Sequence, residues 1–329
     1  MTAAVTLSDI RAARARIAGR VASTPLVPSP SLSTHAPVFL KLETRQPTGS
    51  FKLRGAINAM LALDPETRAR GLVTASTGNH GRALAHAARE AGAHAVVCLS
   101  SLVPANKVEA VRALGAEVRI VGHSQDDAQA EVDRLVRAEG LTEIPPFDHP
   151  DVVAGQGTIG LELVEAVPNL DLVLVPLSGG GLAAGVAVAV RGLRSSARVV
   201  GVSMARGAAM AASLDAGRPV AVDEVETLAD SLGGGIGLAN RTSFALCRDL
   251  LDDVVLLSED EIAAGIRHAQ IREGETVEGA GAVGIAAILA GKVAVHGPTV
   301  AILSGRNIDA AIHARIVADT SAPQSEEAA

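Results

Sequence analysis

The chain contains the stretch Pro47-Thr48-Gly49-Ser50-Phe51-Lys52-Leu53-Arg54-Gly55, in which a strand pattern turns into a helix pattern. The strand-like residues 38–43 come before this turn, and the helix-like residues 55–61 follow it. A helix N-terminus and the neighbouring guanidinium of Arg54 both disfavour a second positive charge, so we expect the pKa of Lys52 to be lowered. Such a lysine is a nucleophilic amine that forms Schiff bases with carbonyl compounds. The competing interpretation is an ordinary surface lysine at a helix start.

Two further stretches join strand patterns to helix patterns through loops of small residues. They read Thr74-Ala75-Ser76-Thr77-Gly78-Asn79-His80-Gly81 and Val173-Leu174-Val175-Pro176-Leu177-Ser178-Gly179-Gly180-Gly181-Leu182-Ala183-Ala184-Gly185. In the second, glycines let the backbone approach a ligand closely, and successive N–H groups at a helix start suit a phosphate. No Gly-Lys-Ser/Thr follows, and the G-x-G-x-x-G spacing is absent, so this is neither a Walker loop nor a dinucleotide fingerprint. Taken alone, the three glycines would indicate only a tight turn.

In this order the three stretches resemble those of the fold-type-II pyridoxal-phosphate (PLP) enzymes, and more closely their threonine dehydratase/serine racemase branch. Two later segments extend the resemblance over nearly the whole chain. Val277-Glu278-Gly279-Ala280-Gly281-Ala282 is similar to the family's Glu-Pro-x-x-Gly, with glycine in place of proline. Leu303-Ser304-Gly305-Arg306-Asn307-Ile308-Asp309 is similar to its Ser-Gly-Gly-Asn, with Arg306 in place of the second glycine. Within the branch, these motifs look most like the dehydratases of hydroxyectoine utilisation.

Short apolar strand patterns alternate with helical patterns along the chain. The expected strands include residues 72–75, 95–99, 117–121, 172–177, 199–202, 254–257 and 300–303. Continuous apolar strands separated by helices predict parallel sheets that are covered on both faces. The resemblance implies a two-lobed α/β fold like that of the tryptophan synthase β subunit, each lobe a mostly parallel sheet flanked by helices. It places residues 1–70 and 149–329 in a large PLP-binding domain and residues 71–148 in a small domain.

Composition excludes several classes of partner. Of the 329 residues, 48% are hydrophobic and 20% charged, the formal net charge is −7, and four Phe are the only aromatics. Recognition of nucleic acid by stacking on aromatic rings is therefore not expected, and the negative charge disfavours polyanions. Cys98 and Cys247 lie in apolar settings typical of buried free thiols. We see no secretory signal and no membrane span, and expect a cytoplasmic homodimer or higher homo-oligomer.

The resemblance assigns a role to each part of a PLP site. Lys52 would bind the cofactor aldehyde and act as the base at the substrate Cα, with Phe51 packed against the cofactor ring. Asn79 would meet the phenolic oxygen, and Glu278 would lie in the site as a carboxylate, with a buried structural role as the alternative. The phosphate would be bound by Ser178, Gly179, Gly180, Gly181 and Leu182. Ser304 would meet the ring nitrogen, where a hydroxyl, unlike a carboxylate, favours β-elimination.

On the substrate side the resemblance implies Ser76, Thr77, Gly78, Asn79 and His80, whose N–H groups and hydroxyls suit an α-carboxylate. Thr77 stands where racemases of the family carry a serine that protonates the opposite face of Cα, so racemisation stays open. No metal site is expected, because Ser203 stands where relatives place a glutamate ligand. Selectivity is expected from loops near residues 76–79, 155–158 and 233–237.

The leading hypothesis is a PLP-dependent dehydratase, or ammonia-lyase, that removes water from a β-hydroxy-α-amino acid and yields a 2-oxo acid and ammonia. Threonine, serine, 3-hydroxyaspartate and a hydroxylated diaminobutyrate derived from hydroxyectoine all offer the same reacting atoms. The alternatives are an amino-acid racemase, a β-replacement synthase, and a ligand-binding sensor on the same scaffold.

Overall fold

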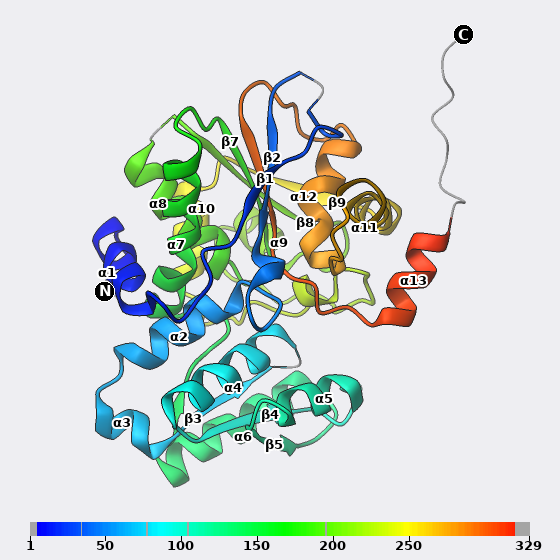
Figure 1. Ribbon diagram of the computed structural model, residues 1–329. Helices are drawn as coiled ribbons and strands as arrows, with labels where there is room; N and C mark the ends of the chain where they lie inside the picture. Colours follow the sequence, from blue (N-terminus) through cyan, green and yellow to red (C-terminus); the bar gives the residue numbers. More distant parts are fainter. Residues whose placement is uncertain (1–4, 34, 77, 104, 195, 320–329) are drawn as a thin grey trace.

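Two β-sheets organise the chain into an upper and a lower lobe (Figure 1). The computed structural model describes residues 5–319, except 34, 77, 104 and 195. Its strands are β1 (Leu26–Pro28), β2 (Val38–Leu42), β3 (Leu72–Ala75), β4 (Ala95–Leu99), β5 (Glu117–Ile120), β6 (Thr142–Glu143), β7 (Leu172–Pro176), β8 (Arg198–Met204), β9 (Asp253–Leu257) and β10 (Thr299–Leu303). The large lobe holds six strands in the order β1-β2-β10-β7-β8-β9, and the small lobe holds four in the order β5-β4-β3-β6.

Helices cover both sheets. They are α1 (Leu7–Ile17), α2 (Lys52–Ala62), α3 (Pro65–Arg70), α4 (Asn79–Ala91), α5 (Ala105–Arg112), α6 (Gln125–Glu139), α7 (Pro150–Ala166), α8 (Gly181–Leu193), α9 (Ala209–Asp215), α10 (Thr242–Leu250), α11 (Glu259–Glu273), α12 (Gly279–Leu289) and α13 (Ala310–Ala318), with short 3₁₀ turns η1 (Glu43–Arg45) and η2 (Asp230–Leu232). Except for the antiparallel pair β1–β2, the paired strands run parallel.

The alternation of side chains along β7 shows why both faces of the large sheet are covered. Val173 and Val175 pack into a core with residues of α1, α7, α8 and α10. Leu172 and Leu174 point to the opposite face and pack with residues of α11 and α12. Because successive strand residues face opposite sides, an apolar run such as Leu172–Pro176 requires helices on both. The predicted α/β class with mostly parallel sheets is confirmed.

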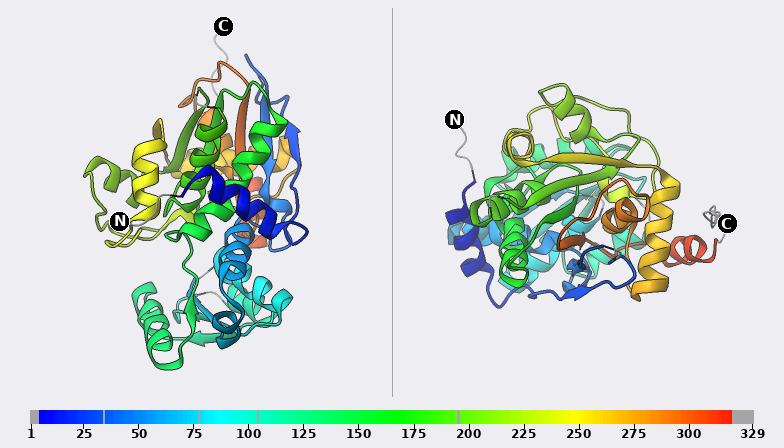
Figure 2. Two further views of the ribbon diagram at one scale, coloured as in Figure 1. Left: turned by 90° about the vertical axis from the view of Figure 1, so that its left-hand side faces the viewer. Right: turned by 90° about the horizontal axis from the view of Figure 1, so that it is seen from above.

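Helix α2 lies between the lobes and packs against both α7 of the large lobe and α4 of the small lobe (Figure 2). Its residues Leu53, Ala56 and Ile57 share one buried core with Leu72 and Leu84 of the small lobe. The first residue of this helix is Lys52, so the candidate nucleophile lies on the element that joins the two cores. The proposed domain boundaries near residues 70 and 148 stay predictions, since α2 belongs to both packing units.

Most expected elements are confirmed within a residue or two, and the differences have physical causes. β1 was not predicted, because it has only three residues and ends in Pro28, which suits the edge of a sheet. The two-residue β6 is too short to leave a pattern. Residues 155–158 were expected in a loop that governs selectivity, but they are buried inside α7. There a Cβ on Gly155 would lie 2.7 Å from the Arg54 carbonyl oxygen, so this glycine allows α2 and α7 to approach.

Candidate active site

A cavity of about 760 Å³ lies between the lobes, beside the residues that follow β3, β7 and β10. Ligands of parallel α/β sheets commonly bind outside the carboxyl ends of the strands. The cavity is lined by all the described residues that the sequence analysis assigned to the site: Phe51, Lys52, Ser76, Gly78, Asn79, His80, Ser178, Gly179, Gly180, Gly181, Leu182, Glu278 and Ser304. Thr77, the remaining candidate, lies outside the described residues.

Lys52 projects into this cavity from the first turn of α2. Its Nζ donates a hydrogen bond of 2.7 Å to the Pro146 carbonyl oxygen and lies 5.2 Å from the centroid of the Phe51 ring. Burial lowers the pKa of Lys52 to about 8, and the negative charge of Glu278 opposes this shift. The unprotonated amine, the form that a nucleophile requires, is therefore a far larger fraction near neutral pH than in an ordinary lysine.

The expected effect of Arg54 on Lys52 is wrong, although the expected direction of the pKa shift is right. The Arg54 side chain is directed to Glu43, which accepts from its Nε at 2.9 Å and its Nη2 at 2.8 Å. Its Nη1 donates at 2.6 Å to Glu162, which also accepts at 2.5 Å from Lys41 Nζ. Two carboxylates thus neutralise the guanidinium, and this buried cluster anchors α2 to the large lobe.

The turn before Lys52 is joined to the segment after β10. Phe51 N donates to the Ser304 carbonyl oxygen at 3.0 Å, and Arg306 N donates to the Gly49 carbonyl oxygen at 2.9 Å. These bonds bring Lys52 and Ser304 to one wall of the cavity, although some 250 residues separate them in the sequence. Arg306 itself is exposed and is not among the residues that line the cavity.

The glycine loop between β7 and α8 has the chemistry of a phosphate site. Gly180 has φ +89°, which favours glycine, and it precedes α8 without providing a side-chain cap. The first N–H groups of α8 are therefore available to an anion. A Cβ on Gly179 would lie 2.4 Å from the Phe147 ring, so the loop also requires glycine for packing. Phe147 lines the cavity, and no sequence motif pointed to it.

Two buried polar groups that line the cavity have strongly shifted pKa values. Burial, with repulsion from Asp230, raises the pKa of Glu278 to about 7. Burial, with the positive charge of Lys52, lowers the pKa of His80 to about 3, while its Nε2 lies 2.7 Å from the Ile144 carbonyl oxygen. His80 is therefore a neutral donor to a carbonyl at physiological pH, and Glu278 is poised to change its charge.

Ser304 lies buried at the end of β10 and lines the cavity. Its Oγ donates a long hydrogen bond of 3.4 Å to the Ala280 carbonyl oxygen, so the hydroxyl is free to turn toward a better partner. A lysine amine, an uncapped helix N-terminus and a serine hydroxyl thus face one cavity. This donor set fits the aldehyde, the phosphate and the ring nitrogen of pyridoxal phosphate.

The outer rim of the cavity is acidic, which the sequence analysis did not anticipate. Asp126 comes from the small lobe, and Glu224, Glu226 and Asp230 come from the large lobe. Lys52 is the single lysine among the described lining residues, and no arginine is among them. Asp230 also accepts a hydrogen bond of 2.7 Å from Lys107 of α5, which ties the two lobes together across the mouth.

Within the described part of the chain, no three His, Cys, Asp or Glu side chains gather closely enough to hold a metal ion. Ser203, which stands where relatives were expected to place a glutamate, is buried, and its Oγ donates to Met204 Sδ at 3.4 Å. The same part of the chain includes no helix with the length and apolar character of a membrane span.

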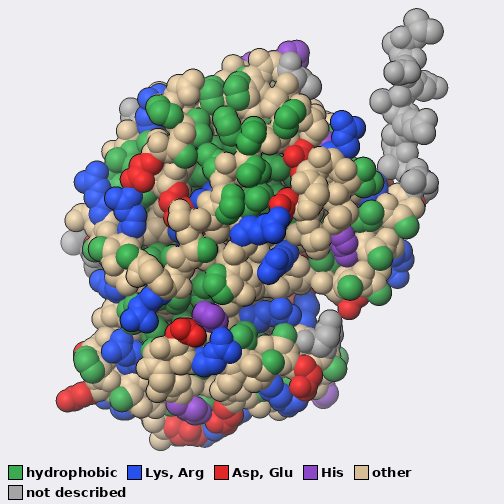
Figure 3. Space-filling view, viewed as in Figure 1, with side chains coloured by type: hydrophobic (Ala, Val, Ile, Leu, Met, Phe, Trp, Pro, Cys, Tyr) green, Lys and Arg blue, Asp and Glu red, His purple; other side chains and the backbone are tan. Residues whose placement is uncertain are grey.

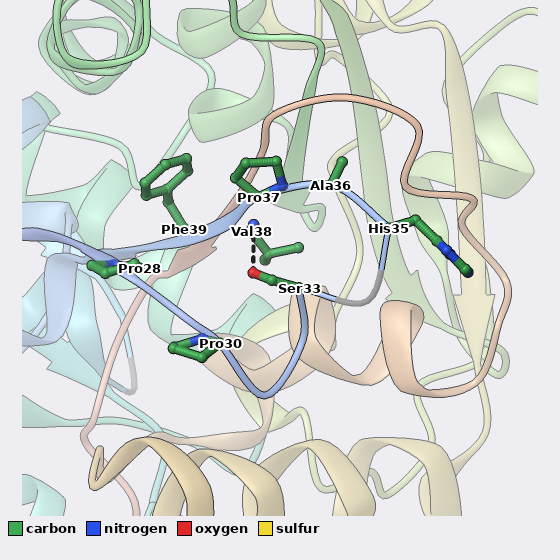
Figure 4. Close-up of a pocket in the computed structure, with 8 residues that line it drawn as sticks. All are labelled: Pro28, Pro30, Ser33, His35, Ala36, Pro37, Val38 and Phe39. Atoms are coloured by element: carbon green, nitrogen blue, oxygen red, sulfur yellow. Dashed lines mark hydrogen bonds between the residues drawn. The ribbon is translucent and has the colours of Figure 1, made fainter.

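A second, smaller hollow of about 420 Å³ lies at the β1–β2 hairpin (Figure 4). Its walls are mainly apolar, with Pro28, Pro30 and Phe39 around it. The Ser33 hydroxyl in this hollow accepts a hydrogen bond of 2.9 Å from Val38 N. Figure 4 shows His35 pointing away from Ser33, so the hollow does not assemble a group of reactive side chains.

Comparisons with known proteins agree with this geometry. The family model described as "Pyridoxal-phosphate dependent enzyme" matches residues 17–305. A putative threonine dehydratase of Sinorhizobium fredii is 61% identical over 95% of this chain and 95% of its own length. The catabolic L-threonine dehydratase TdcB of Escherichia coli K12 is 39% identical over 93% of this chain and 94% of its own. The solved structure of maize serine racemase superposes with a TM-score of 0.89 at 34% identity, covering 95% and 97% of the two chains.

Proposed function

Because this chain belongs to the family of pyridoxal-phosphate dependent enzymes, we propose that it is a dehydratase, or ammonia-lyase, acting on a β-hydroxy-α-amino acid. The observation that carries this proposal is the junction of Lys52 and Ser304, which the bond from Phe51 N to the Ser304 carbonyl oxygen brings into one cavity with the glycine loop. The relatives named as threonine dehydratases support the same reaction class.

The cofactor would be held at four points. Lys52 would bind its aldehyde, the N–H groups of residues 178–182 its phosphate, and Ser304 its ring nitrogen. Asn79 would donate to its phenolic oxygen. When bound in this way, pyridoxal phosphate withdraws electrons from the Cα of an amino acid that is joined to it. A serine at the ring nitrogen leaves carbanion character near Cα, which favours loss of a β-substituent.

Lys52 is the candidate base for the Cα proton, because its pKa of about 8 lies far closer to neutral pH than that of an ordinary lysine. Loss of the Cα proton and of the β-hydroxyl removes one water molecule from the substrate. The resulting enamine tautomerises and takes up one water, which releases ammonia and leaves the 2-oxo acid. The backbone N–H groups of residues 76–80 would orient the substrate carboxylate at the start of α4.

The finer proposal is that the substrate carries a second positive charge, as does a hydroxylated diaminobutyrate derived from hydroxyectoine. Glu224, Glu226 and Asp126 on the rim support it, because carboxylates at the mouth of a cavity attract a cation and repel an anion. Threonine and serine have neutral side chains, which the acidic rim would neither attract nor repel. On the same argument 3-hydroxyaspartate would be disfavoured.

Racemisation is the second candidate, and the similarity to maize serine racemase favours it. It requires a proton donor on the face of Cα opposite Lys52, and Thr77 is the residue that the sequence suggests. β-Replacement by a thiol remains a third use of the same site. A sensor without activity has no need for Lys52, Asn79 and Ser304 together.

We also propose a homo-oligomer, a dimer or larger, in the cytoplasm. Figure 3 shows hydrophobic side chains gathered over the upper lobe, on the face where β1 and β2 lie in front. Such a gathering is typical of a surface covered by another chain. The buried free thiols Cys98 and Cys247 fit a reducing compartment. Light scattering after size exclusion tests the oligomer, and a monomer at all concentrations would contradict it.

The function is tested by measuring ammonia release from four substrates: threonine, serine, 3-hydroxyaspartate and 3-hydroxy-2,4-diaminobutyrate. We expect the diamino substrate to have the lowest KM and 3-hydroxyaspartate the highest. The variants Glu224→Gln and Glu226→Gln should raise the KM for the cationic substrate and leave that for serine unchanged. Release of ammonia from none of the four would refute the dehydratase, and equal KM values would refute the charge preference alone.

A further inference from the structure

A chain of hydrogen bonds crosses from the small lobe to the large lobe behind the cavity. Arg82 of α4 donates from Nη1 to Asn307 Oδ1 at 3.0 Å. Asn307 Nδ2 donates to Asn79 Oδ1 at 2.5 Å and to the Thr48 carbonyl oxygen at 2.9 Å. Asn79 Nδ2 donates to Glu278 Oε1 at 2.7 Å. Figure 1 shows α4 on the side of the small lobe that faces the large lobe.

The ends of this chain fix the direction of each bond within it. A guanidinium can only donate, so the Asn307 atom that faces Arg82 must be the amide oxygen. The Thr48 carbonyl oxygen can only accept, so it must face the amide nitrogen of Asn307. That nitrogen also faces Asn79, whose amide oxygen is therefore turned toward Asn307 and whose nitrogen is turned toward Glu278.

One N–H of Asn79 is left over in this arrangement. The amide nitrogen carries two hydrogens, and Glu278 takes one of them. Asn79 lines the cavity and is 8% exposed, so the second N–H is available there to an acceptor. If the amide were turned over, its oxygen would face the Glu278 carboxylate, and the cavity would lose this donor. The orientation of Asn79 thus decides whether it can serve a phenolic oxygen.

Packing holds Asn307 in place for this purpose. Gly49 has φ +76°, and a Cβ there would lie 2.7 Å from Asn307 Oδ1. The Asn307 backbone N–H donates at 3.1 Å to the second oxygen of Glu278. Asn307 therefore contacts the turn before Lys52, the carboxylate of Glu278 and the amide of Asn79 at once. Arg82, together with the Thr48 carbonyl oxygen, selects between the two orientations of the Asn307 side-chain amide.

We propose that Arg82 is a positioning residue that, through Asn307, sets which end of the Asn79 amide faces Glu278 and so directs an N–H of Asn79 to the cofactor. This inference rests on the proposed contact between Asn79 and the phenolic oxygen. Arg82 itself does not line the cavity, and its effect is exerted through two amides. Arg82 and Asn307 come from different lobes, so the chain depends on the packing of the small lobe against the large lobe.

The test compares the dissociation constant and visible absorbance spectrum of bound pyridoxal phosphate in four variants. Arg82→Met removes the donor, and Arg82→Lys keeps an N–H donor on a side chain of nearly the same reach. Arg89→Met is the matched control, because Arg89 lies on the same helix and is 49% exposed. Asn79→Ala tests the premise. Loss of one well-placed hydrogen bond predicts a weakening of cofactor binding by roughly five- to tenfold in Arg82→Met and Asn79→Ala.

Arg82→Lys and Arg89→Met should bind the cofactor within about twofold of the parent, since neither loses the orienting donor. Parental affinity and spectrum in Arg82→Met would overturn the proposal, as would an equal loss in Arg82→Lys, because lysine keeps a donor to Asn307. Parental binding in Asn79→Ala would overturn its premise, the contact of Asn79 with the cofactor. A purely structural contact would lower the urea midpoint of the cofactor-free Arg82→Met protein without changing cofactor affinity.

Discussion

Replacement of Arg54 by methionine tests the buried cluster that anchors the helix bearing Lys52. Methionine keeps the apolar stem of the side chain but removes its hydrogen bonds to Glu43 and Glu162. Arg54 is 1% exposed and Glu43 is 0% exposed. Once Arg54 is replaced, water therefore cannot hydrate the unpaired carboxylate of Glu43. Removing one partner of a buried ion pair costs about 3–5 kcal/mol. We expect a loss of this size in the free energy of unfolding at neutral pH.

The dependence of this loss on pH follows from Glu43. Burial alone would raise the pKa of Glu43, but the Arg54 guanidinium outweighs it and the pKa is lowered. In the parent, ionised Glu43 therefore stabilises the fold above the pKa of the unfolded state, and this contribution is lost as the pH falls through the folded pKa. In Arg54→Met burial is opposed only by the Thr24 hydrogen bond and the Lys41 charge, so folded Glu43 takes up a proton more readily. The difference in stability between parent and variant should shrink toward acidic pH.

The assay is urea unfolding of the cofactor-free protein by far-ultraviolet circular dichroism, since the chain has no Trp or Tyr to report by fluorescence. Omitting the cofactor keeps its binding energy out of the comparison. Arg14→Met is the control, because its ion pair with Glu165 is 48% and 59% exposed and should contribute less than about 1 kcal/mol. The reasoning is refuted if Arg54→Met costs no more than Arg14→Met, or if its cost is independent of pH.

Three further outcomes are expected. Glu278→Gln removes the negative charge that opposes the lowering of the Lys52 pKa, so this pKa should fall below about 8. The pH profile of cofactor attachment, followed by visible absorbance, should then move to lower pH. An unmoved profile would contradict this. Ser304→Asp places a carboxylate at the proposed ring-nitrogen position and should slow elimination relative to exchange of the Cα proton with deuterated solvent. An unchanged ratio of elimination to exchange, measured by NMR, would show that the assignment of Ser304 is wrong. Turnover should survive exhaustive chelation, because Ser203 offers no carboxylate to a cation; a loss that Mg²⁺ or Ca²⁺ restores would count against it.

The sequence was sufficient for the local features of the site. The lysine turn, the asparagine loop and the glycine loop each have their own pattern of strand, small residues and helix, and all three line the cavity. Alternating apolar strands and helices also predicted parallel sheets covered on both faces. These features depend on neighbours within a few residues, so local propensity and hydrophobic pattern are enough to predict them.

Features that depend on distant partners were not predictable. The guanidinium of Arg54 was expected to act on Lys52, but it pairs with Glu162, which lies 108 residues away in the sequence. Phe147, which packs against the glycine loop, and Asp230, which lies on the rim, belong to no motif. They enter the site only through the tertiary fold. The link between Arg82 and Asn307 spans 225 residues and joins the two lobes.

The central claim is tested most directly by the products formed from one β-hydroxy amino acid, with ammonia and 2-oxo acid measured in the same incubation. The account predicts equal amounts of the two from the cofactor-loaded enzyme, and neither from the folded Lys52→Ala variant. Inversion at Cα with little ammonia, or undiminished ammonia release from Lys52→Ala, would contradict it.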